Sequence, residues 1–253
     1  MIEEDFSIGC SIIHRLDPRV KTAAAWVFSV VVAVSDRFPA LVFSIFIALA
    51  LAGLARLSLK ILLSRLLLVN ILIFLIWIFI PFTIEGKPLF SLGPLTATMD
   101  GVIYSAMITI KSNSIILALI ALTATMPVFT LGRAMKHLYV PSKIVHLFLF
   151  TYRYIHAIHR EYRRLMDAIS IRGFQPGTNM HTYRTYAYLI GMLLVKSYDR
   201  AERVRAAMLC RGFRGRFYDL SEFSLKSADL ITMLIMLLAV TGIGLLQWTR
   251  IIY

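Results

Sequence analysis

The chain has 253 residues, of which 58% are hydrophobic, and its mean hydropathy is +0.75. Charged residues make up only 16% of it, against about 25% in ordinary soluble domains. A soluble fold of this size would expose much of that apolar surface, which argues against a cytosolic enzyme. The only two cysteines, Cys10 and Cys210, exclude a disulfide scaffold.

The positive charge is confined to one segment. The net charge is +13, and residues 127–217 alone hold 16 Lys and Arg against 4 Asp and Glu. Such a segment can indicate nucleic-acid binding. Apolar segments flank it on both sides, however, and membrane topology explains the bias. We therefore expect no nucleic-acid partner, and we take the anionic inner leaflet of the lipid bilayer and a protein partner as candidates for the positive face.

Five apolar segments follow a polar N-terminal stretch, which lacks the basic start of a cleavable signal peptide. They occupy residues 20–35, 38–55, 66–84, 101–126 and 228–249. Because a membrane span needs about 20 apolar residues, we predict an all-α membrane protein with about five transmembrane helices. Residues 85–100 are expected to form an external loop, with Pro88, Gly93 and Pro94 as turn residues.

The loops predict the orientation, because basic residues concentrate on the cytoplasmic side of a membrane. Of the 27 basic residues, 23 lie before the first apolar segment, between the second and third, or within 127–227. We expect a multi-pass protein of the prokaryotic inner (plasma) membrane, with a cytoplasmic N-terminus and an external C-terminus. The expected divisions are an N-terminal part with four spans (1–126), cytoplasmic coupling helices (127–227) and a last span (228–253).

The cytoplasmic segment predicts two long amphipathic helices after a short amphipathic piece at 127–140. Apolar residues recur at helical spacing from Lys143 to Arg172 and again over residues 186–208. Gly173 and Gly212 are the expected stops. Each helix has about 30 residues and is therefore about 45 Å long. We expect the two to pack together and to lie along the membrane face, apolar on one side and arginine-rich on the other.

Both long helices end in the same way. Ile171-Arg172-Gly173-Phe174 closes the first, and Cys210-Arg211-Gly212-Phe213 closes the second. Each end is expected to place an Arg on the last turn, a Gly in the left-handed stop and an exposed aromatic ring. Capping explains either end alone, because Arg favours the negative end of the helix dipole. The repetition favours a second role, since an arginine can form bidentate bonds to carboxylates or carbonyls in a partner's groove.

These ends, taken with two other motifs, make the chain resemble a known family. The other motifs are the N-terminal His14-Arg15-Leu16-Asp17-Pro18-Arg19-Val20-Lys21 and a stretch from Ile190 to Met208. The chain resembles the transmembrane T component of energy-coupling factor (ECF) transporters, which are ATP-driven importers of vitamins and metals, and in particular its cobalt/nickel (CbiQ-type) subgroup. The resemblance covers essentially the whole chain. Ile171 and Cys210 depart from the alanine usual in the family's paired Ala-Arg-Gly signatures.

The resemblance implies an energy-coupling subunit that links two ABC ATPases to a substrate-binding S component. Cobalt or nickel ions are the expected cargo, a vitamin-type S component is the alternative, and a further small membrane subunit stays an open partner. The chain itself is expected to be no enzyme and to bind no cofactor, with ATP and Mg held by the partner ATPases. The implied ATPase-docking residues are Ile171, Arg172, Gly173, Cys210, Arg211 and Gly212.

Five further residues are candidates for structural contacts or contacts with the S component. Asp17 and Pro18 are expected to begin the first span as its N-cap and first helical residue, followed by Arg19. Asn70 and Lys111 fall inside predicted spans, where a polar group is costly unless it is paired or hydrated. They indicate a contact between helices or with the S component, and an internal hydrogen bond or snorkelling to the interface explains them equally.

No catalytic or metal site is predicted. His156 and His159 are three residues apart, but no third ligand accompanies them and neighbouring arginines oppose a cation. The sequence has no H-E-x-x-H, Walker A or G-x-S-x-G motif. Two competing hypotheses remain: an autonomous permease or channel, which would need a polar path through its own spans, and a membrane-embedded enzyme, for which no constellation of catalytic groups is seen.

Overall fold

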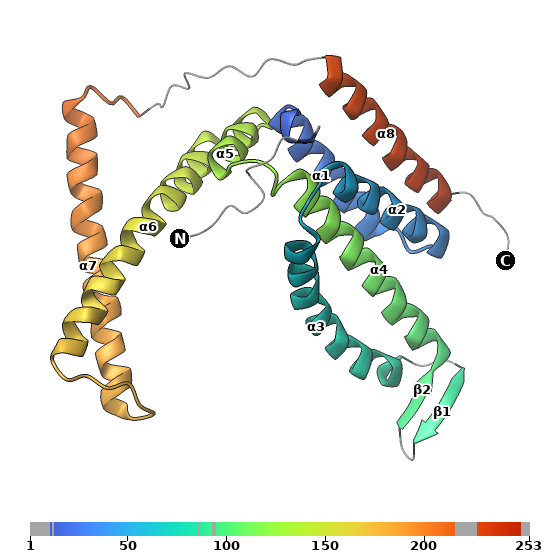
Figure 1. Ribbon diagram of the computed structural model, residues 1–253, viewed down its shortest axis with the longest axis horizontal. Coiled ribbons are helices and arrows are strands. Elements are labelled where there is room, and N and C mark those ends of the chain that lie inside the picture. Colours follow the sequence, from blue (N-terminus) through green and yellow to red (C-terminus); the bar gives the residue numbers. More distant parts are fainter. Residues whose placement is uncertain (1–10, 12, 85–86, 93–94, 216–226, 249–253) are drawn as a thin grey trace. The chain divides into compact units, whose positions relative to one another are not determined.

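The chain folds into two compact units. The computed structural model describes residues 11, 13–84, 87–92, 95–215 and 227–248. One unit, which we call the bundle unit, comprises Ile2–Pro141 and Phe223–Tyr253; the other, the helix-pair unit, comprises Ser142–Glu222. The structure is helical apart from one short hairpin (Figure 1).

The bundle unit contains the five apolar helices that the sequence predicts. They are α1 (Pro18–Val34), α2 (Phe38–Leu54), α3 (Leu59–Thr83), α4 (Met99–Leu122) and α8 (Ser227–Trp248). A single 3-10 turn, Ile13–Arg15, precedes α1, and the short amphipathic helix α5 (Val128–His137) follows α4. The helix-pair unit consists of α6 (Ser142–Ile171) and α7 (Met180–Cys210).

The helix-pair unit begins later than the coupling segment that we expected from residue 127. α5 belongs to the bundle unit because it packs against α1, with Gly132 and Ala134 buried. The compact unit therefore starts at Ser142, after Pro141. The functional division at residue 127 stays a prediction.

Within the described residues, three helices are long and apolar enough to cross a membrane. These segments are Leu62–Thr83, Met99–Leu122 and Asp229–Gln247. α2 is apolar but has only 17 residues, and α1 also has 17, which corresponds to about 25 Å for each at 1.5 Å per residue. The hydrocarbon core of a bilayer is about 30 Å thick, so α1 and α2 are short for it. The fold is that of an all-α membrane protein with one added hairpin.

That hairpin lies where we expected a loop. β1 (Pro88–Leu92) pairs antiparallel with β2 (Leu95–Thr98), with Phe90 opposite Ala97 and Leu92 opposite Leu95. Pro88 begins the first strand, while Gly93 and Pro94, the other predicted turn residues, lie outside the described residues. The paired strands satisfy backbone groups that an open loop would leave to solvent.

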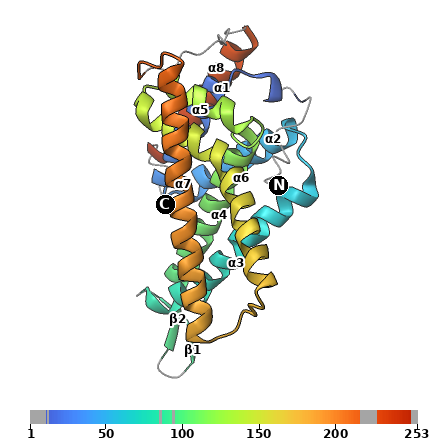
Figure 2. The ribbon, with the colours of Figure 1, turned by 90° about the vertical axis from the view of Figure 1, so that its left-hand side faces the viewer.

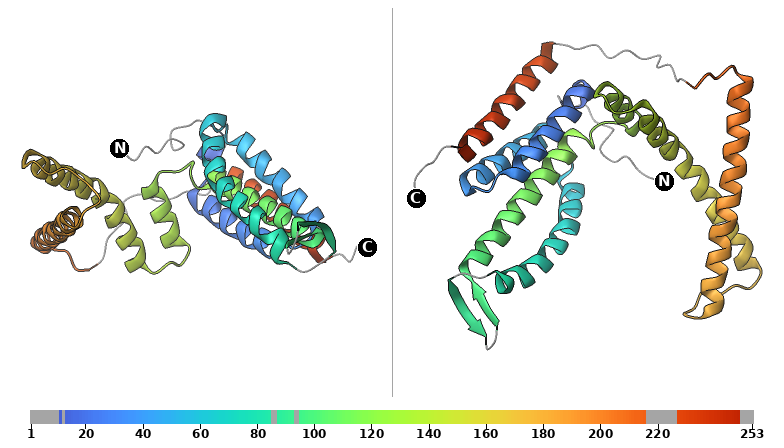
Figure 3. Two further views of the ribbon diagram at one scale, coloured as in Figure 1. Left: turned by 90° about the horizontal axis from the view of Figure 1, so that it is seen from below. Right: turned by 180° about the vertical axis from the view of Figure 1, so that it is seen from behind.

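α4 lies at the centre of the bundle unit and packs against α1, α2 and α3 (Figure 3). Its buried positions are dominated by small side chains, and so are those of its neighbours. Buried small residues include Ala25, Ala40, Ser44, Ala48, Ala52, Ser105, Ser114, Ala118 and Ala121. Small residues let helix backbones approach closely, which is how membrane helices associate when the hydrophobic effect does not drive them together.

α3 and α4 approach each other closely at Gly101. A Cβ atom at this position would lie 2.7 Å from the Cα atom of Pro81 and 3.0 Å from the carbonyl oxygen of Ile80. The hydroxyl of Thr98, the N-cap of α4, donates to the carbonyl oxygen of Ile84 at 2.7 Å and to that of Pro81 at 3.3 Å. The end of α3 and the start of α4 therefore lie in close backbone contact.

We expect Gly101→Ala to destabilise the bundle unit by about 1–3 kcal/mol, because the added methyl group meets backbone atoms that cannot move aside cheaply. Thermal unfolding of the purified chain in detergent measures this effect. Gly244→Ala in α8 is the matched control, since nothing lies within 4 Å of the new methyl group there. Equal unfolding midpoints for the two variants would contradict the close packing at Gly101.

Candidate docking site at two helix ends

The two predicted docking motifs lie at opposite ends of the helix-pair unit. α6 and α7 run in opposite directions, so the end of α6 lies near the start of α7 (Figures 1 and 2). The end of α7 is about 45 Å from its start, and so from the nearby end of α6, because α7 has 31 residues. A partner that engages both ends must offer two separate binding sites.

Both helices end in the same Schellman motif. In α6 the N–H of Phe174 donates to the carbonyl oxygen of Ile169 at 3.2 Å. The N–H of Gly173 donates to the carbonyl oxygen of Ser170 at 3.0 Å. In α7 the N–H of Phe213 donates to Met208 at 3.1 Å, and that of Gly212 to Leu209 at 2.9 Å. These bonds satisfy carbonyl groups that a helix end otherwise leaves unpaired. The repeated sequence thus builds one backbone geometry twice.

The glycines are required by backbone conformation alone. The φ angles of Gly173 and Gly212 are +80° and +78°, and no atom lies within 4 Å of where a Cβ would stand. The residue just before each glycine, Arg172 or Arg211, is exposed. Its neighbour Ile171 is also 86% exposed, and Cys210 is exposed. Each turn therefore presents an apolar or thiol side chain and a guanidinium group outward.

The expectation that both motifs display an exposed aromatic ring is wrong. Phe174 and Phe213 are half-buried. The ring of Phe174 meets that of Tyr186 edge-on, with 5.9 Å between centroids, and lies 6.3 Å from the ring of His181. Phe174 thus fixes the end of α6 onto the first turns of α7. That α7 begins nearby could not be seen in a local pattern.

The start of α7 is also capped firmly. The Asn179 side chain accepts from the N–H of Thr182 at 3.0 Å and from its hydroxyl at 2.6 Å, and the N–H of Gly177 donates to that hydroxyl at 3.1 Å. Thr182 is buried. The connection that carries the first docking motif is therefore held by side-chain hydrogen bonds as well as by the Schellman motif.

The carboxylate of Glu161 joins α6 to α7. Glu161 of α6 accepts from the Lys196 ammonium of α7 at 2.5 Å, with Arg164 at 3.8 Å and Arg200 at 3.9 Å. The Glu161 side chain is only 13% exposed. It is one of just four acidic residues in the strongly basic 127–217 segment. Repulsion between the basic faces of the two helices is therefore relieved where they touch.

The same cations lower the pKa of Glu161. The largest cause is the hydrogen bond from Lys196. Burial, the second largest, raises the pKa, and the positive charges of Lys196, Arg164 and Arg200 lower it further. A carboxyl whose pKa is depressed on folding stabilises the fold at pH values above its unfolded pKa, about 4.3 for glutamate. That contribution is lost as the pH falls through the folded pKa.

The predicted apolar stripes of the long helices are half-buried at most positions and exposed at the others. Val145, Ala157 and Leu189 are the buried apolar residues of the described part of the helix-pair unit. The exposed apolar residues of α7 include Met180, Tyr183, Ile190, Leu194 and Tyr198. The spacing of these five places them along one face of the helix. The two helices thus contact each other as predicted, but no predicted stripe position is fully buried, and further apolar residues of α7 are exposed.

The N-terminal motif begins α1 as predicted. Asp17 is the N-cap, its carboxylate accepting from the N–H of Arg19 at 2.8 Å, and Pro18 is the first helical residue. The Arg19 guanidinium lies 3.3 Å from Nε2 of His137 on α5. Asp17 and Lys21 are both buried. The motif is thus placed where α1 meets α5.

Asn70 makes a contact between helices. Its side-chain amide on α3 and that of Asn113 on α4 exchange two hydrogen bonds of 3.1 Å each. Both amides also donate to carbonyl oxygens of their own helices at 2.9 Å. Nearby, the indole N–H of Trp77 donates to the hydroxyl of Thr109 at 2.9 Å. These bonds satisfy polar groups inside predicted spans and link α3 to α4.

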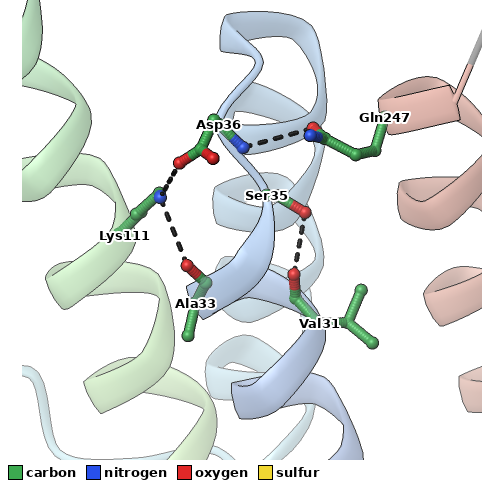
Figure 4. Close-up of polar contacts among 6 residues, drawn as sticks. All are labelled: Val31, Ala33, Ser35, Asp36, Lys111 and Gln247. Carbon is green, nitrogen blue, oxygen red and sulfur yellow. Dashed lines mark hydrogen bonds and ion pairs between the residues drawn. The ribbon is translucent and has the colours of Figure 1, made fainter.

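Lys111 is held at the junction of three elements (Figure 4). Its ammonium on α4 donates to the carboxylate of Asp36 at 2.7 Å and to the carbonyl oxygen of Ala33 at 3.2 Å. The Asp36 N–H in turn donates to the side chain of Gln247 on α8 at 3.2 Å. The loop after α1 thus bonds to the middle of α4 through Lys111 and to the end of α8 through Gln247. Both Lys111 and Asn70 therefore make contacts between helices or loops of the bundle unit.

The histidines show no common site. His156 meets Tyr152 edge-on and His159 stacks near Tyr162, at centroid distances of 6.2 and 6.4 Å. Among the described residues, no three His, Cys, Asp or Glu side chains come together in a way that would hold a metal ion. These two histidines therefore lie beside aromatic rings of their own helix.

Several polar residues of these contacts escaped sequence reasoning. They are Asp36, Asn113, His137, Glu161 and Asp229. A signal existed for two of them: Glu161 is a rare acid in a basic segment, and Asp229 is an acid at the very start of an apolar run. The partners of the others come from distant parts of the chain, which no local pattern reveals.

Known proteins similar to this chain cover most of its length. Residues 9–220 match the CbiQ family, which is described as "Cobalt transport protein". Three relatives are each named "Energy-coupling factor transporter transmembrane protein EcfT". The protein of Thermosediminibacter oceani is 27% identical over 88% of both chains, that of Acidaminococcus fermentans 28% over 95% of this chain and 94% of its own, and that of Heliobacterium modesticaldum 30% over 80% of both.

We expect Gly173→Ala to destabilise the end of α6 by about 1–2 kcal/mol, because a left-handed conformation costs an L-residue with a Cβ about that much. Gly173→Asn should cost less, since asparagine tolerates this conformation. Hydrogen exchange of peptides covering residues 169–175 measures the local opening. The same exchange rate in the alanine variant and the wild type would contradict the conformational requirement.

We expect Glu161→Gln to lower the thermal unfolding midpoint at pH 7, because it removes the charge that faces Lys196. The difference from the wild type should shrink as the pH falls below about 4.3, the unfolded pKa, and vanish once the pH is below the lowered folded pKa of Glu161. Glu202→Gln is the control, an exposed glutamate on α7. A difference that persists unchanged at low pH would show that packing, not charge, is responsible.

Proposed function

This chain belongs to the CbiQ family of cobalt transport proteins, and we propose that it is the energy-coupling transmembrane component of an ECF importer. In this role it links two ABC ATPases, which hydrolyse ATP, to an S component, which binds the substrate. The observation that carries the proposal is the pair of identical Schellman motifs, which present Arg172 and Arg211 at opposite ends of one helical unit.

The geometry of these ends suits docking into grooves. An exposed guanidinium on a fixed turn loses little freedom on binding and can form two parallel hydrogen bonds to a carboxylate or to backbone carbonyls. Two such turns about 45 Å apart match a partner with two equivalent sites, as in an ATPase dimer. ATP and Mg belong to those partners, and this chain is a non-catalytic subunit.

The exposed apolar face of α7 supports a second partner. Its tyrosine, methionine and aliphatic side chains, from Met180 to Tyr198, lie on the surface of the helix-pair unit. Contiguous apolar surface of this kind marks an interaction site or a membrane contact. A membrane-embedded S component, with its own apolar exterior, is the partner we assign to it.

Cobalt or nickel ions are the proposed cargo, on the strength of the family's description as cobalt transport proteins. Vitamin-type cargo is the alternative, because the S component selects the substrate. The competing function, an autonomous permease, needs an open polar path. Asn70 and Lys111 instead bond to partners within the bundle unit, which argues against that path.

The proposed location is the inner (plasma) membrane, with the basic helix-pair unit on the cytoplasmic side. The three candidate spans and the charge distribution support this location. In this topology the N-terminus is cytoplasmic and the C-terminus external. The ATPases then reach both docking turns from the cytoplasm, where ATP is available.

We expect the double variant Arg172→Glu/Arg211→Glu to lose at least 10-fold of the ATPase recovered with the tagged chain from mild-detergent extracts. Each single reversal should retain partial binding, because the second turn still docks. Mass spectrometry of the co-purified proteins provides the measurement and also identifies the S component. Arg205→Glu, an exposed arginine within α7, is the control. ATPase recovery unaffected by the double reversal would refute the docking role.

A further inference from the structure

An apolar groove lies between α2 and α8 within the bundle unit. Its lining residues are Phe38, Pro39, Val42, Phe43 and Phe46 of α2 and Leu246 of α8. The residues of α2 recur every four positions and therefore share one face of the helix. From Phe38 to Phe46 this face is about 12 Å long, at 1.5 Å per residue. The groove thus follows about two turns of α2.

The groove lies on the surface, beside a close contact between the two helices. The five α2 residues that line it are exposed. Beside them α2 touches α8, because a Cβ atom at Gly242 would lie 3.4 Å from Cε1 of Phe43. The next residue of α8, Ile243, is fully buried. The contact between α2 and α8 therefore supports the groove from within.

One end of the groove is polar (Figure 4). There the N–H of Asp36 donates to the side chain of Gln247 at 3.2 Å. Asp36 lies two residues before Phe38, and Gln247 follows Leu246. The Asp36 carboxylate accepts from the Lys111 ammonium at 2.7 Å, and the Asp36 side chain is still 77% exposed. Charges of both signs therefore stand beside one end of an otherwise apolar groove.

The side chains of this face favour a lipid over another helix. Membrane helices associate through small residues, which let their backbones approach closely. The small residues of α2 are already used, since Ala40, Ser44 and Ala48 are buried and Ser44 bonds to Ser114 of α4 at 3.3 Å. The groove face carries three phenylalanine rings instead, which hold a second helix backbone at a distance. A flexible acyl chain can follow such a surface.

The length of α2 brings its ends close to lipid headgroups. The helix has 17 residues and is about 25 Å long, whereas the hydrocarbon core of a bilayer is about 30 Å thick. A bilayer adapts to a short span by thinning, which draws headgroups toward the ends of the helix. Polar groups at that depth need polar partners. A headgroup at the Asp36 end supplies them.

We propose that the groove between α2 and α8 binds one membrane phospholipid, with an acyl chain along Phe38–Phe46 and the headgroup beside Asp36. An amphiphile matches both parts of the groove, the apolar face and the charged end. A chain seated there also adds contact between α2 and α8. The site goes beyond the energy-coupling role, and lipid binding requires neither the ATPases nor an S component, so either proposal can fail without the other.

Native mass spectrometry of the full chain, purified in mild detergent and titrated with palmitoyl-oleoyl phosphatidylethanolamine, tests the site. Val42→Trp fills the middle of the groove, and Phe46→Ala removes part of its wall. Phe46→Ala decides the test if the larger side chain disturbs folding, because Phe46 is 66% exposed and is not part of the core. The matched control is Val30→Trp, the same change at an exposed valine of α1 that does not line the groove.

The wild type and Val30→Trp should bind a first lipid more tightly than any further lipid. Val42→Trp should bind it at least five-fold more weakly, and Phe46→Ala at least two-fold more weakly. Wild-type affinity in a folded Val42→Trp chain or in Phe46→Ala would overturn the site, as would an equal loss in the control.

A photo-cross-linking residue in place of Val42 identifies the occupant in native membranes. A lipid adduct is the expected product. A protein adduct would show that a partner chain covers the groove, and it would overturn the proposal.

Discussion

Close approach of helix backbones around α4 is the constraint on which the bundle unit depends. Within a bilayer, apolar side chains gain nothing by leaving lipid for protein, so association must come from contact and hydrogen bonding. The alanines and serines that line α4 and its neighbours allow this contact. At Gly101 the backbone lies so close to Pro81 that no Cβ atom would fit. Many large apolar side chains point outward, above all on α3, while Phe28, Leu41 and Ile243 are fully buried. Both small and large side chains therefore form the interior of the bundle unit.

The helix-pair unit obeys a different rule. Its two helices touch through few buried side chains, and much of its apolar surface faces outward. Its order comes from fixed ends: two Schellman motifs, the Asn179 cap and the ring of Phe174 against Tyr186. Such a unit has defined contact points at its tips and an open face between them. We interpret it as a part shaped for partners, whose apolar surface is completed only in a larger complex.

Three of the few acidic residues in this basic chain make contacts between separate segments. Glu161 relieves repulsion between α6 and α7, Asp36 holds Lys111 at the end of α1, and Asp229 binds the other end of α1. Each of these carboxylates joins segments that are distant in sequence. The chain has 14 acidic against 27 basic residues, so an acidic residue is the scarcer partner of any ion pair. Their placement therefore says more about tertiary contacts than the placement of any single lysine or arginine.

Local pattern predicted the elements of this protein well. The five apolar helices, the two long helices and their glycine stops follow from composition, periodicity and the conformational freedom of glycine. The N-cap at Asp17 and the family resemblance also rest on adjacent residues, so the sequence alone determined them. The candidate docking residues were visible for the same reason, because each motif is complete within four residues.

The tertiary structure decided which surfaces each helix packs against, which no local stretch of sequence shows. It placed α5 with the bundle unit, set the ring of Phe174 against Tyr186, and left apolar residues of α7 such as Met180 and Leu194 exposed. It also paired Asn70 with Asn113 and Asp17 with Asp229. The physical reason is that helical periodicity says which residues share a face but not which surface that face meets. That surface is chosen by backbone approach and charge pairing between segments far apart in the chain.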